Sequence, residues 1–268
     1  MRGGVQAWPE AMVAVSLKMY LNHDATLAWA HQIAQIVRSR PCDQVEVVIL
    51  PSFPSLSGVA STVAGTAVRL GAQNLSEYAE GPYTGEVDAA SLVQIGCRYV
   101  EIGHAERRRR YGEEEPVVGR KLAAALRAGL IPLLCLGETE RTGSPGAAHH
   151  CVDQLGSALS WVPDDLGEKP LVIAYEPIWA IGADQPAGLE HIQSVCVALR
   201  DFLDQSQPTR PVRLVYGGSA GPGLLSQLGE AVDGLFLGRF AHQPSAFATI
   251  LQEATERVTG AARAQRHT

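Results

Sequence analysis

Residues 171–182 carry the sequence LVIAYEPIWAIG, and this stretch decides the fold. It begins with a short run rich in Leu, Val and Ile, reaches a carboxylate at Glu176, and continues as an apolar segment that ends at Gly182. An unbroken apolar run of this length is typical of a parallel strand that is covered on both faces. The stretch therefore predicts a buried strand with an acidic residue at its C-terminal end.

The same pattern recurs along the whole chain. Helical periodicity fills most of the intervals, for instance at 25–37, 120–128, 189–203 and 246–258. Eight strands, each followed by room for a helix, predict one closed (β/α)8 barrel, although a doubly wound open sheet has a similar pattern. We expect a single domain over residues 1–268, with an N-terminal extension at 1–11 and a C-terminal tail at 261–268. The predicted strands are 12–17, 45–50, 69–73, 99–102, 131–136, 171–175, 212–216 and 234–237.

Composition limits the class of protein. The 268 residues are 46% hydrophobic and 19% charged, as in a globular domain, and the net charge of -6 argues against a nucleic-acid partner. The first residues lack the apolar core of a signal peptide, and the apolar runs are too short to cross a bilayer. The five cysteines are scattered, with neither metal-ligand spacing nor a disulfide pattern. We therefore expect a cytoplasmic protein that uses no metal and no membrane.

The barrel hypothesis predicts where the polar residues of an active site should lie. Active sites of such barrels are built from the loops that follow the strands, so polar residues should gather there. They do so after seven of the predicted strands. These residues are Ser16, Lys18, Gln73, Asn74, His104, Glu138, Glu176, Gly217, Gly218, Ser219, Gly238 and Arg239.

Glu176 is the strongest candidate for a catalytic base. A carboxylate at the rim of an apolar barrel is partly desolvated, and this makes it a better base toward a carbon acid. Most glutamates at strand ends are ordinary surface residues. Here, however, the apolar residues 177–181 follow directly, and an exposed apolar loop is costly unless it closes over something. We expect this loop to act as a lid that keeps water from a reactive intermediate.

His104 and Lys18 are the next candidates. Gly103 precedes His104 and a helical pattern follows it, so the ring is expected at a helix N-terminus, where the helix dipole favours the neutral imidazole. A neutral ring can donate a hydrogen bond to a carbonyl oxygen. Lys18 shares strand parity with Ser16 and should point the same way, toward a phosphate or a developing negative charge. We interpret the charged run at 107–115 as a solvated helix face and its loop.

A phosphate site is predicted at the last two strands. Gly217, Gly218 and Ser219 follow the seventh strand, and Gly238 follows the eighth. Barrels commonly bind phosphate with backbone N–H groups of these two loops. Glycine pairs are common in turns, but their presence at both loops is a more specific signal.

The chain resembles the triosephosphate isomerase family over nearly its whole length. The resemblance lies in SLKM from Ser16, GAQN from Gly71, GPYTGE from Gly81, IGHAERR from Ile102, CLGE from Cys135, AYEPIWAIG from Ala174 and YGGS from Tyr216. Such a resemblance implies a TIM barrel, an isomerase of small sugar phosphates that needs no cofactor or metal, and a homodimer in which the third βα loop reaches into the partner's site. Thr84 matches the tip of that loop.

The resemblance also implies roles, which belong to the family and do not follow from spacing. Glu176 matches the base that moves the proton, His104 the neutral electrophile, and Lys18 the cation that stabilises the intermediate and the phosphate. Glu106 would support a neighbouring group. The phosphate-binding positions and the lid match Gly182, Gly217, Gly218, Ser219, Gly238 and residues 177–187.

At two positions that bind the substrate in the family, this chain has a different residue. Ser16 stands where the family has Asn, and Arg239 stands where it has a second glycine. Both could be drift, with Arg239 pointing outward. The shorter Ser16 would instead make room for one more hydroxymethyl group, and erythrulose-phosphate isomerases resemble this family and carry Ser there. We expect isomerisation of L-erythrulose 1-phosphate, with triose phosphate as the alternative. A non-catalytic sugar-phosphate-binding barrel, or a Schiff-base lyase or synthase, is a more distant possibility.

Overall fold

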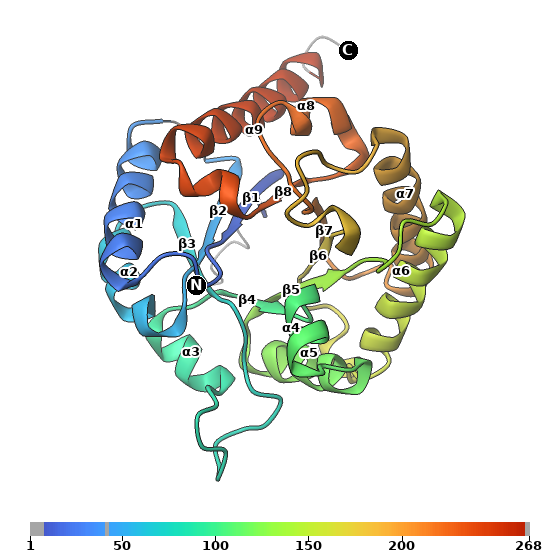
Figure 1. Ribbon diagram of the computed structural model, residues 1–268, viewed down its shortest axis with the longest axis horizontal. Helices are drawn as coiled ribbons and strands as arrows, with labels where there is room; N and C mark the ends of the chain where they lie inside the picture. The colour runs from blue at the N-terminus through green and yellow to red at the C-terminus, as the bar shows by residue number, and fades with distance from the viewer. Residues whose placement is uncertain (1–7, 41–42, 266–268) are drawn as a thin grey trace, which may run out of the picture.

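The computed structural model describes residues 8–40 and 43–265, and side chains as far as residue 260. Within these residues, eight parallel strands close into a barrel in sequence order, and helices surround it (Figure 1). The strands are β1 (Ala11–Ser16), β2 (Val45–Leu50), β3 (Val68–Ala72), β4 (Tyr99–Ile102), β5 (Ile131–Leu136), β6 (Leu171–Tyr175), β7 (Val212–Tyr216) and β8 (Gly234–Leu237).

The barrel is closed by the pairing of the first strand with the last. Residues Met12 to Val15 of β1 lie in register with Gly234 to Leu237 of β8. An open doubly wound sheet has two edge strands that each pair on one side only. Here every strand pairs with two neighbours, so that alternative is excluded and the (β/α)8 barrel is confirmed. Gly234 is required at this closure, because a Cβ atom there would lie 1.9 Å from the carbonyl oxygen of Met12.

The helices form the outer ring of Figure 1. Several are bounded by capping residues that the sequence supplies: Asn22 accepts a hydrogen bond from Ala25 N at the start of α1, and Gly129 ends α5 in the left-handed conformation. No described helix is long and apolar enough to span a membrane. The helices are α1 (His23–Arg38), α2 (Leu56–Val63), α3 (Ala89–Ile95), α4 (Ala105–Tyr111), α5 (Glu115–Ala128), α6 (Ser144–Leu159), α7 (Leu189–Ser206), α8 (Leu224–Leu228) and α9 (Pro244–Gln265), with short 3₁₀ turns η1 (Phe53–Ser55), η2 (Asp164–Leu166), η3 (Ile178–Ala180), η4 (Gly229–Ala231) and η5 (Arg239–His242).

The predicted element bounds agree closely with the structure. Strands β2, β4, β5, β6, β7 and β8 have the predicted ends, whereas β1 and β3 each begin and end one residue earlier than predicted. Helix α9 continues to Gln265 and so enters the stretch we had taken as a C-terminal tail. Residues 1–7 of the predicted N-terminal extension and residues 266–268 lie outside the described residues.

The barrel interior is a core of its own, separate from the larger core between strands and helices. Its members point inward at alternate positions of the strands, as closed parallel barrels require. The next inward positions toward the C-terminal ends are Ser16, Glu101 and Glu176, so polar groups cap the apolar interior on that face. The apolar interior consists of Met12, Ala14, Val48, Leu50, Tyr99, Ile131, Leu133, Cys135, Val172, Ala174, Val215 and Phe236.

The opposite mouth of the barrel is filled by polar contacts. Tyr99 Oη donates to Glu46 Oε1 at 2.8 Å and accepts from Trp8 Nε1 at 3.2 Å. Arg213 stacks over the Trp8 ring and donates to the carbonyl of Pro9. The chain just before β1 therefore covers this end, and the accessible cavity is at the other.

Candidate active site

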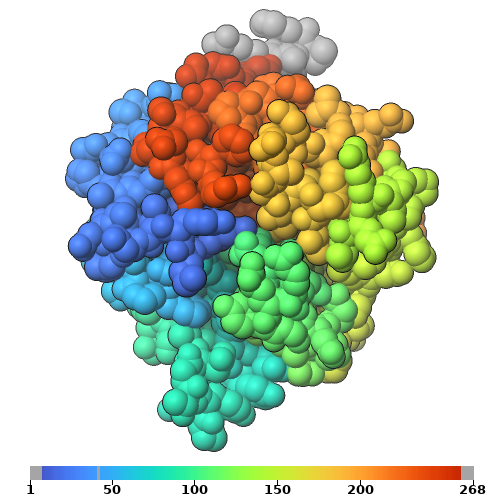
Figure 2. All heavy atoms as spheres, in the orientation of Figure 1, coloured from blue at the N-terminus to red at the C-terminus, as the bar shows by residue number. Residues whose placement is uncertain are grey.

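A cavity of about 550 Å³ opens at the C-terminal ends of the strands. Figure 2 shows this face, where the loop after β1, helix α4, the predicted lid and the turn η5 meet around its centre. Nearly every predicted catalytic and phosphate-site residue lines the cavity; Gly217 and Thr84 do not. The lining includes Ser16, Lys18, His104, Glu106, Glu176, Gly182, Gly218, Ser219, Gly238 and Arg239.

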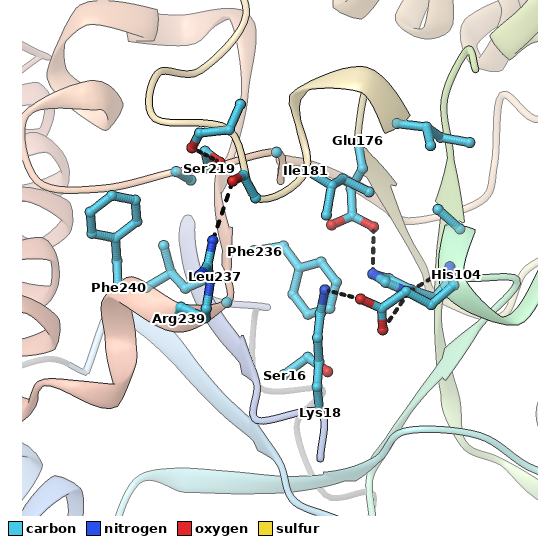
Figure 3. Close-up of a pocket in the computed structure, with 18 of the residues that line it drawn as sticks. Ser16, Lys18, His104, Glu176, Ile181, Ser219, Phe236, Leu237, Arg239 and Phe240 are labelled. Atoms are coloured by element: carbon cyan, nitrogen blue, oxygen red, sulfur yellow. Dashed lines mark hydrogen bonds and ion pairs between the residues drawn. The ribbon is translucent and has the colours of Figure 1, made fainter. Parts of the chain in front are cut away.

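Glu176 and His104 face each other across the cavity floor (Figure 3). Glu176 Oε2 and His104 Nε2 are 3.5 Å apart, and both residues are almost completely buried. Neither of these two atoms has a hydrogen-bond partner among the described residues. Buried polar atoms are normally satisfied, so two unsatisfied atoms that converge on one cavity indicate a place for a polar ligand.

The hydrogen bonding of His104 defines its tautomer. His104 is the N-cap of α4, and its Nδ1 accepts a hydrogen bond from the backbone N–H of Glu106 at 3.2 Å. An Nδ1 that accepts carries no proton, so the ring is neutral with its proton on Nε2. The prediction of a neutral ring at a helix N-terminus is consistent with this geometry, and the ring aims its single N–H at the cavity.

Lys18 reaches the same cavity by a strained backbone. Its φ is 50°, a value that costs a side-chain-bearing residue roughly 1–3 kcal/mol. The amide of Gln73 donates to the carbonyl oxygens of Lys18 and Leu50 and holds this turn in place. Because β1 ends at Ser16, the turn and not strand parity brings Lys18 beside Ser16, so our reason for that prediction was wrong although the two residues do share the cavity.

The charge of Lys18 is fixed by its carboxylate neighbours. Its Nζ forms an ion pair with Glu106 Oε1 at 2.9 Å. Burial alone would lower the pKa of Lys18, but Glu176 and Glu106 outweigh burial and raise it above its ordinary value. Burial is the largest single effect on Glu106 and raises its pKa, but the hydrogen bond and charge of Lys18, together with His104 and Arg110, bring the pKa below its ordinary value. Lys18 therefore stays a cation, and Glu106 is its anionic support.

Glu101 is a site residue that the sequence analysis did not single out. It lies on β4 and is almost completely buried, and its Oε2 is hydrogen-bonded to Ser16 Oγ at 2.8 Å. Its Oε1 is 4.0 Å from His104 Nε2. Burial is the main cause that raises the pKa of Glu101, and the nearby Glu176 carboxylate raises it further. A signal was available, because a charged residue inside the apolar strand YVEI is unusual for a strand buried on both faces.

Gly217 makes room for the base. A Cβ atom at this position would lie 2.4 Å from Glu176 Cγ and 2.5 Å from its Oε1. On the other side of Glu176, a Cβ at Gly137 would meet the Glu176 carbonyl oxygen at 2.0 Å. The two glycines let β6 deliver Glu176 into the cavity between its neighbouring strands.

The predicted phosphate end of the cavity is formed by the last two loops and the lid. Gly182, Gly218, Ser219 and Gly238 meet there, and Ser219 has a left-handed backbone with φ 60°. Arg239 lies on the cavity wall, and its Nη2 donates to the carbonyl of Gly182 at 3.2 Å (Figure 3). Arg239 is an exposed residue, and this hydrogen bond directs its guanidinium toward the lid at the wall of the cavity.

The lid is fastened over the cavity by the loop after β7. Ser219 Oγ lies 2.9 Å from the carbonyl of Ala180 and 2.8 Å from that of Ala183, and it donates to these lid oxygens. At the far end of the lid, the backbone N–H of Ala187 donates to Tyr216 Oη at 3.1 Å. Residues 177–187, the predicted lid, are thus held against the end of β7 and the loop that follows it. Tyr216 was not predicted as a functional residue.

The interpretation of residues 107–115 as a solvated face was partly wrong. Arg109 and Arg110 are exposed, but Arg107 pairs with Glu113 and Arg108 with Glu115. Glu113 is buried and also accepts from Lys121 Nζ at 2.6 Å. This part of the run is a buried ionic network that fastens α4 to α5.

Thr84 lies far from the cavity of its own chain. It is exposed on the loop between β3 and α3, which projects from the body of the molecule in Figure 1. The rings of Tyr78 and Tyr83 stack at 4.3 Å and stiffen this loop.

Comparison with known proteins agrees with this geometry. A family model described as triosephosphate isomerase matches residues 11–254. L-erythrulose-1-phosphate isomerase of Pectobacterium atrosepticum is 48% identical over 90% of this chain and 95% of its own length. Triosephosphate isomerases of Symbiobacterium thermophilum and Mycobacterium sp. (strain JLS) are 41% and 37% identical, over 79% and 89% of this chain and 85% and 94% of their own. The chain belongs to the triosephosphate isomerase family.

Proposed function

We propose that this isomerase converts L-erythrulose 1-phosphate into D-erythrulose 4-phosphate, with Glu176 as the base and His104 as the electrophile. The observation that carries the proton-transfer chemistry is the pair of unsatisfied atoms, Glu176 Oε2 and His104 Nε2, 3.5 Å apart on the cavity floor. Lys18 supplies the positive charge that an enediolate intermediate requires.

The proton transfers follow from this arrangement. Glu176 removes the proton from carbon 3, and the electron pair moves to the carbonyl oxygen on carbon 2, giving an enediolate. His104 donates its Nε2 proton to that oxygen and takes the proton of the hydroxyl on carbon 3. Glu176 then returns its proton to carbon 2, and the carbonyl is left on carbon 3. Numbered from the other end, the product is D-erythrulose 4-phosphate.

The phosphate is assigned to the end of the cavity beneath the lid. Gly182, Gly218, Ser219 and Gly238 would offer backbone N–H groups, and Arg239 a positive charge. Gly217 supports the site by leaving room for the base. The closed lid keeps water from the enediolate, which would otherwise lose its phosphate.

The choice of a four-carbon substrate rests on Ser16. This side chain is short and lines the same cavity as His104 and Glu176, between which the reacting carbon would sit. A hydroxymethyl group on that carbon needs space there. The 48% identical relative is an L-erythrulose-1-phosphate isomerase. Triosephosphate isomerase activity is the second candidate, because the groups that would move the proton are the same for both substrates.

Proton exchange with solvent tests this proposal. L-erythrulose 1-phosphate is incubated with the protein in D2O and followed by NMR. We expect product that carries deuterium on the carbon that receives the proton, and a loss of turnover of roughly 10³-fold or more in Glu176→Gln. If L-erythrulose 1-phosphate stayed unchanged while dihydroxyacetone phosphate was isomerised rapidly, triose phosphate would be the substrate. No exchange into either sugar would favour a non-catalytic barrel.

We also propose a homodimer in the cytoplasm, formed through the loop between β3 and α3. Tyr78, Tyr83 and Met19 are exposed by 44%, 40% and 92%, and such apolar side chains are suited to a protein interface. The cysteines Cys97, Cys135, Cys151 and Cys196 are buried and unpaired, which suits a reducing compartment; Cys42 lies outside the described residues.

A further inference from the structure

Glu101 is a buried acid that the proposed proton transfers do not use. Its side chain is 4% exposed and lies beneath the cavity floor. It touches two groups that face the substrate: Ser16 Oγ at 2.8 Å and, more distantly, His104 Nε2 at 4.0 Å. Glu101 itself does not line the cavity, so any effect on the substrate passes through these neighbours.

The surroundings of Glu101 favour its neutral form. Lys18, a cation whose charge acts on Glu101, is already paired with Glu106 at 2.9 Å. Glu176 is a second carboxyl group of the same layer, and an ionised Glu101 would repel it and the enediolate alike. A buried charge without an ion pair costs several kcal/mol, which a carboxyl group avoids by keeping its proton.

The protonation of Glu101 decides what Ser16 can do. A serine hydroxyl has a single proton. If Glu101 is ionised, Ser16 must donate that proton to it, and only the lone pairs of Oγ remain for the substrate. If Glu101 is neutral, its own O–H donates to Ser16 Oγ, and the Ser16 proton is free to point into the cavity. A donor is what the negatively charged oxygen of an enediolate requires.

We propose that Glu101 is a positioning residue that holds the Ser16 hydroxyl as a hydrogen-bond donor to the oxygen on the reacting carbon. The chain of hydrogen bonds runs from Glu101 to Ser16 to the substrate, and each proton stays on its own oxygen. The inference deepens the proposed function, since it assigns Ser16 a role in stabilising the intermediate besides making space.

A double-mutant cycle tests this proposal. The variants are Glu101→Leu, Glu101→Gln, Ser16→Ala and the combination of Glu101→Leu with Ser16→Ala. We expect Glu101→Leu to lower kcat by about 10- to 100-fold with little change in KM, because the Ser16 hydroxyl is then no longer held as a donor to the intermediate. Glu101→Gln should stay within about 5-fold of the parent, since its amide can donate to Ser16. The double variant should be no worse than the more impaired single variant.

Two outcomes would overturn the proposal. One is multiplication of the two single losses in the double variant, which would mean that Glu101 does not act through Ser16. The other is an equal loss in Glu101→Gln and Glu101→Leu. The thermal midpoint of every variant is measured first, and Glu101→Met replaces Glu101→Leu if the latter does not fold.

Glu46 provides a matched control. It is also a buried glutamate of the barrel interior, 5% exposed, but it lies at the opposite mouth and accepts a hydrogen bond from Tyr99. Glu46→Leu should lower thermal stability without the selective fall in kcat. The cycle is run on whichever of the two sugar phosphates the unmodified protein converts. The Glu101 proposal can therefore be tested even if the substrate assignment is wrong. Failure of the double-mutant cycle would in turn not affect the substrate assignment.

Discussion

Ser16 is the residue at which we propose that substrate size is decided. It ends β1, lines the cavity and contacts Glu101 below. Asparagine at this position would fill part of the space that an added hydroxymethyl group occupies. Serine leaves that space open, and in our proposal its hydroxyl still reaches the reacting end of the sugar.

Ser16→Asn should change the substrate preference of the protein. We expect the ratio of kcat/KM for dihydroxyacetone phosphate to kcat/KM for L-erythrulose 1-phosphate to rise by roughly 10-fold or more. This corresponds to about 1.4 kcal/mol in the difference between the activation free energies of the two substrates, because the larger sugar loses space. Steady-state kinetics with both sugars measures this ratio. An unchanged ratio would mean that position 16 does not select the substrate.

Arg239 should contribute to phosphate binding. Its guanidinium holds the lid carbonyl of Gly182 with one N–H group and leaves others at the cavity wall. We expect Arg239→Gly to raise KM for either sugar phosphate, and the inhibition constant of inorganic phosphate, by about 3- to 10-fold with little change in kcat. Arg110→Gly, at an exposed arginine of α4, is the control. Equal inhibition constants in the parent and in Arg239→Gly would remove Arg239 from the phosphate site.

The burial of Glu101 predicts how stability depends on pH. Burial, with the Glu176 charge, raises the pKa of Glu101 in the folded chain above its ordinary value of 4.5. Between these two pKa values the folded chain keeps a proton that the unfolded chain has lost. The contribution of Glu101 to the free energy of unfolding therefore falls as pH rises through this window, by up to about 1.4 kcal/mol per pH unit.

Urea unfolding from pH 4.5 to pH 8 measures this dependence. Glu101→Gln cannot ionise at position 101, so its stability relative to the parent should increase with pH. The other titrating groups are common to both proteins and cancel in the difference. A difference that stays constant across the range would show that Glu101 is already ionised when folded at the acid end.

At the scale of elements, the lid depends on the loop after β7. Tyr216 Oη accepts from Ala187 N, and Ser219 Oγ donates to the carbonyls of Ala180 and Ala183. These bonds tie the middle of the lid segment to the loop after β7, and its C-terminal end to the last residue of β7. A shift of this part of the chain would therefore loosen the lid at both places.

Tyr216→Phe should weaken the closed lid. The ring would still pack, but the N–H of Ala187 would lose its partner, at a cost of about 1–2 kcal/mol. We expect kcat/KM to fall by roughly 10-fold and the elimination of inorganic phosphate from the intermediate to become measurable, because water enters more often. Phosphate release per turnover measures this. If Tyr216→Phe released no more phosphate per turnover than the parent, Tyr216 would have no part in lid closure.

The elements were largely predictable from sequence because most strands here are near-continuous apolar runs. The position of Lys18 was harder to explain. The left-handed turn at Lys18 is held by Gln73, a residue more than fifty positions away, and such tertiary support has no local sequence signal. The pairing of Glu113 with Arg107 and with Lys121 was missed for the same reason, since a run of charges looks solvated until the neighbouring helix is placed against it.

At the scale of the whole molecule, the catalytic residues come from separate strand ends that only barrel closure brings together. Each could be predicted by its place after a strand, but the contact between Ser16 and Glu101 joins β1 to β4 and depends on side-chain packing in the barrel interior. Their sequence separation of 85 residues explains why that pair was not predicted.

The proposed dimer predicts that Thr84→Arg will be less active. A bulky cation at the tip of the loop between β3 and α3 would not fit an interface with the partner subunit. We expect a monomer in sedimentation experiments and a fall in kcat of roughly 10²-fold or more. Val197→Arg, at an exposed position of α7, should change neither property. A fully active monomer would exclude the loop as part of the partner's site.

The most direct test of the central claim is the kcat/KM of the purified protein for L-erythrulose 1-phosphate and dihydroxyacetone phosphate, measured side by side. We predict efficient turnover of the four-carbon sugar and a lower kcat/KM for the triose phosphate. A preference for dihydroxyacetone phosphate would contradict the assignment and would make Ser16 and Arg239 tolerated variation in a triosephosphate isomerase.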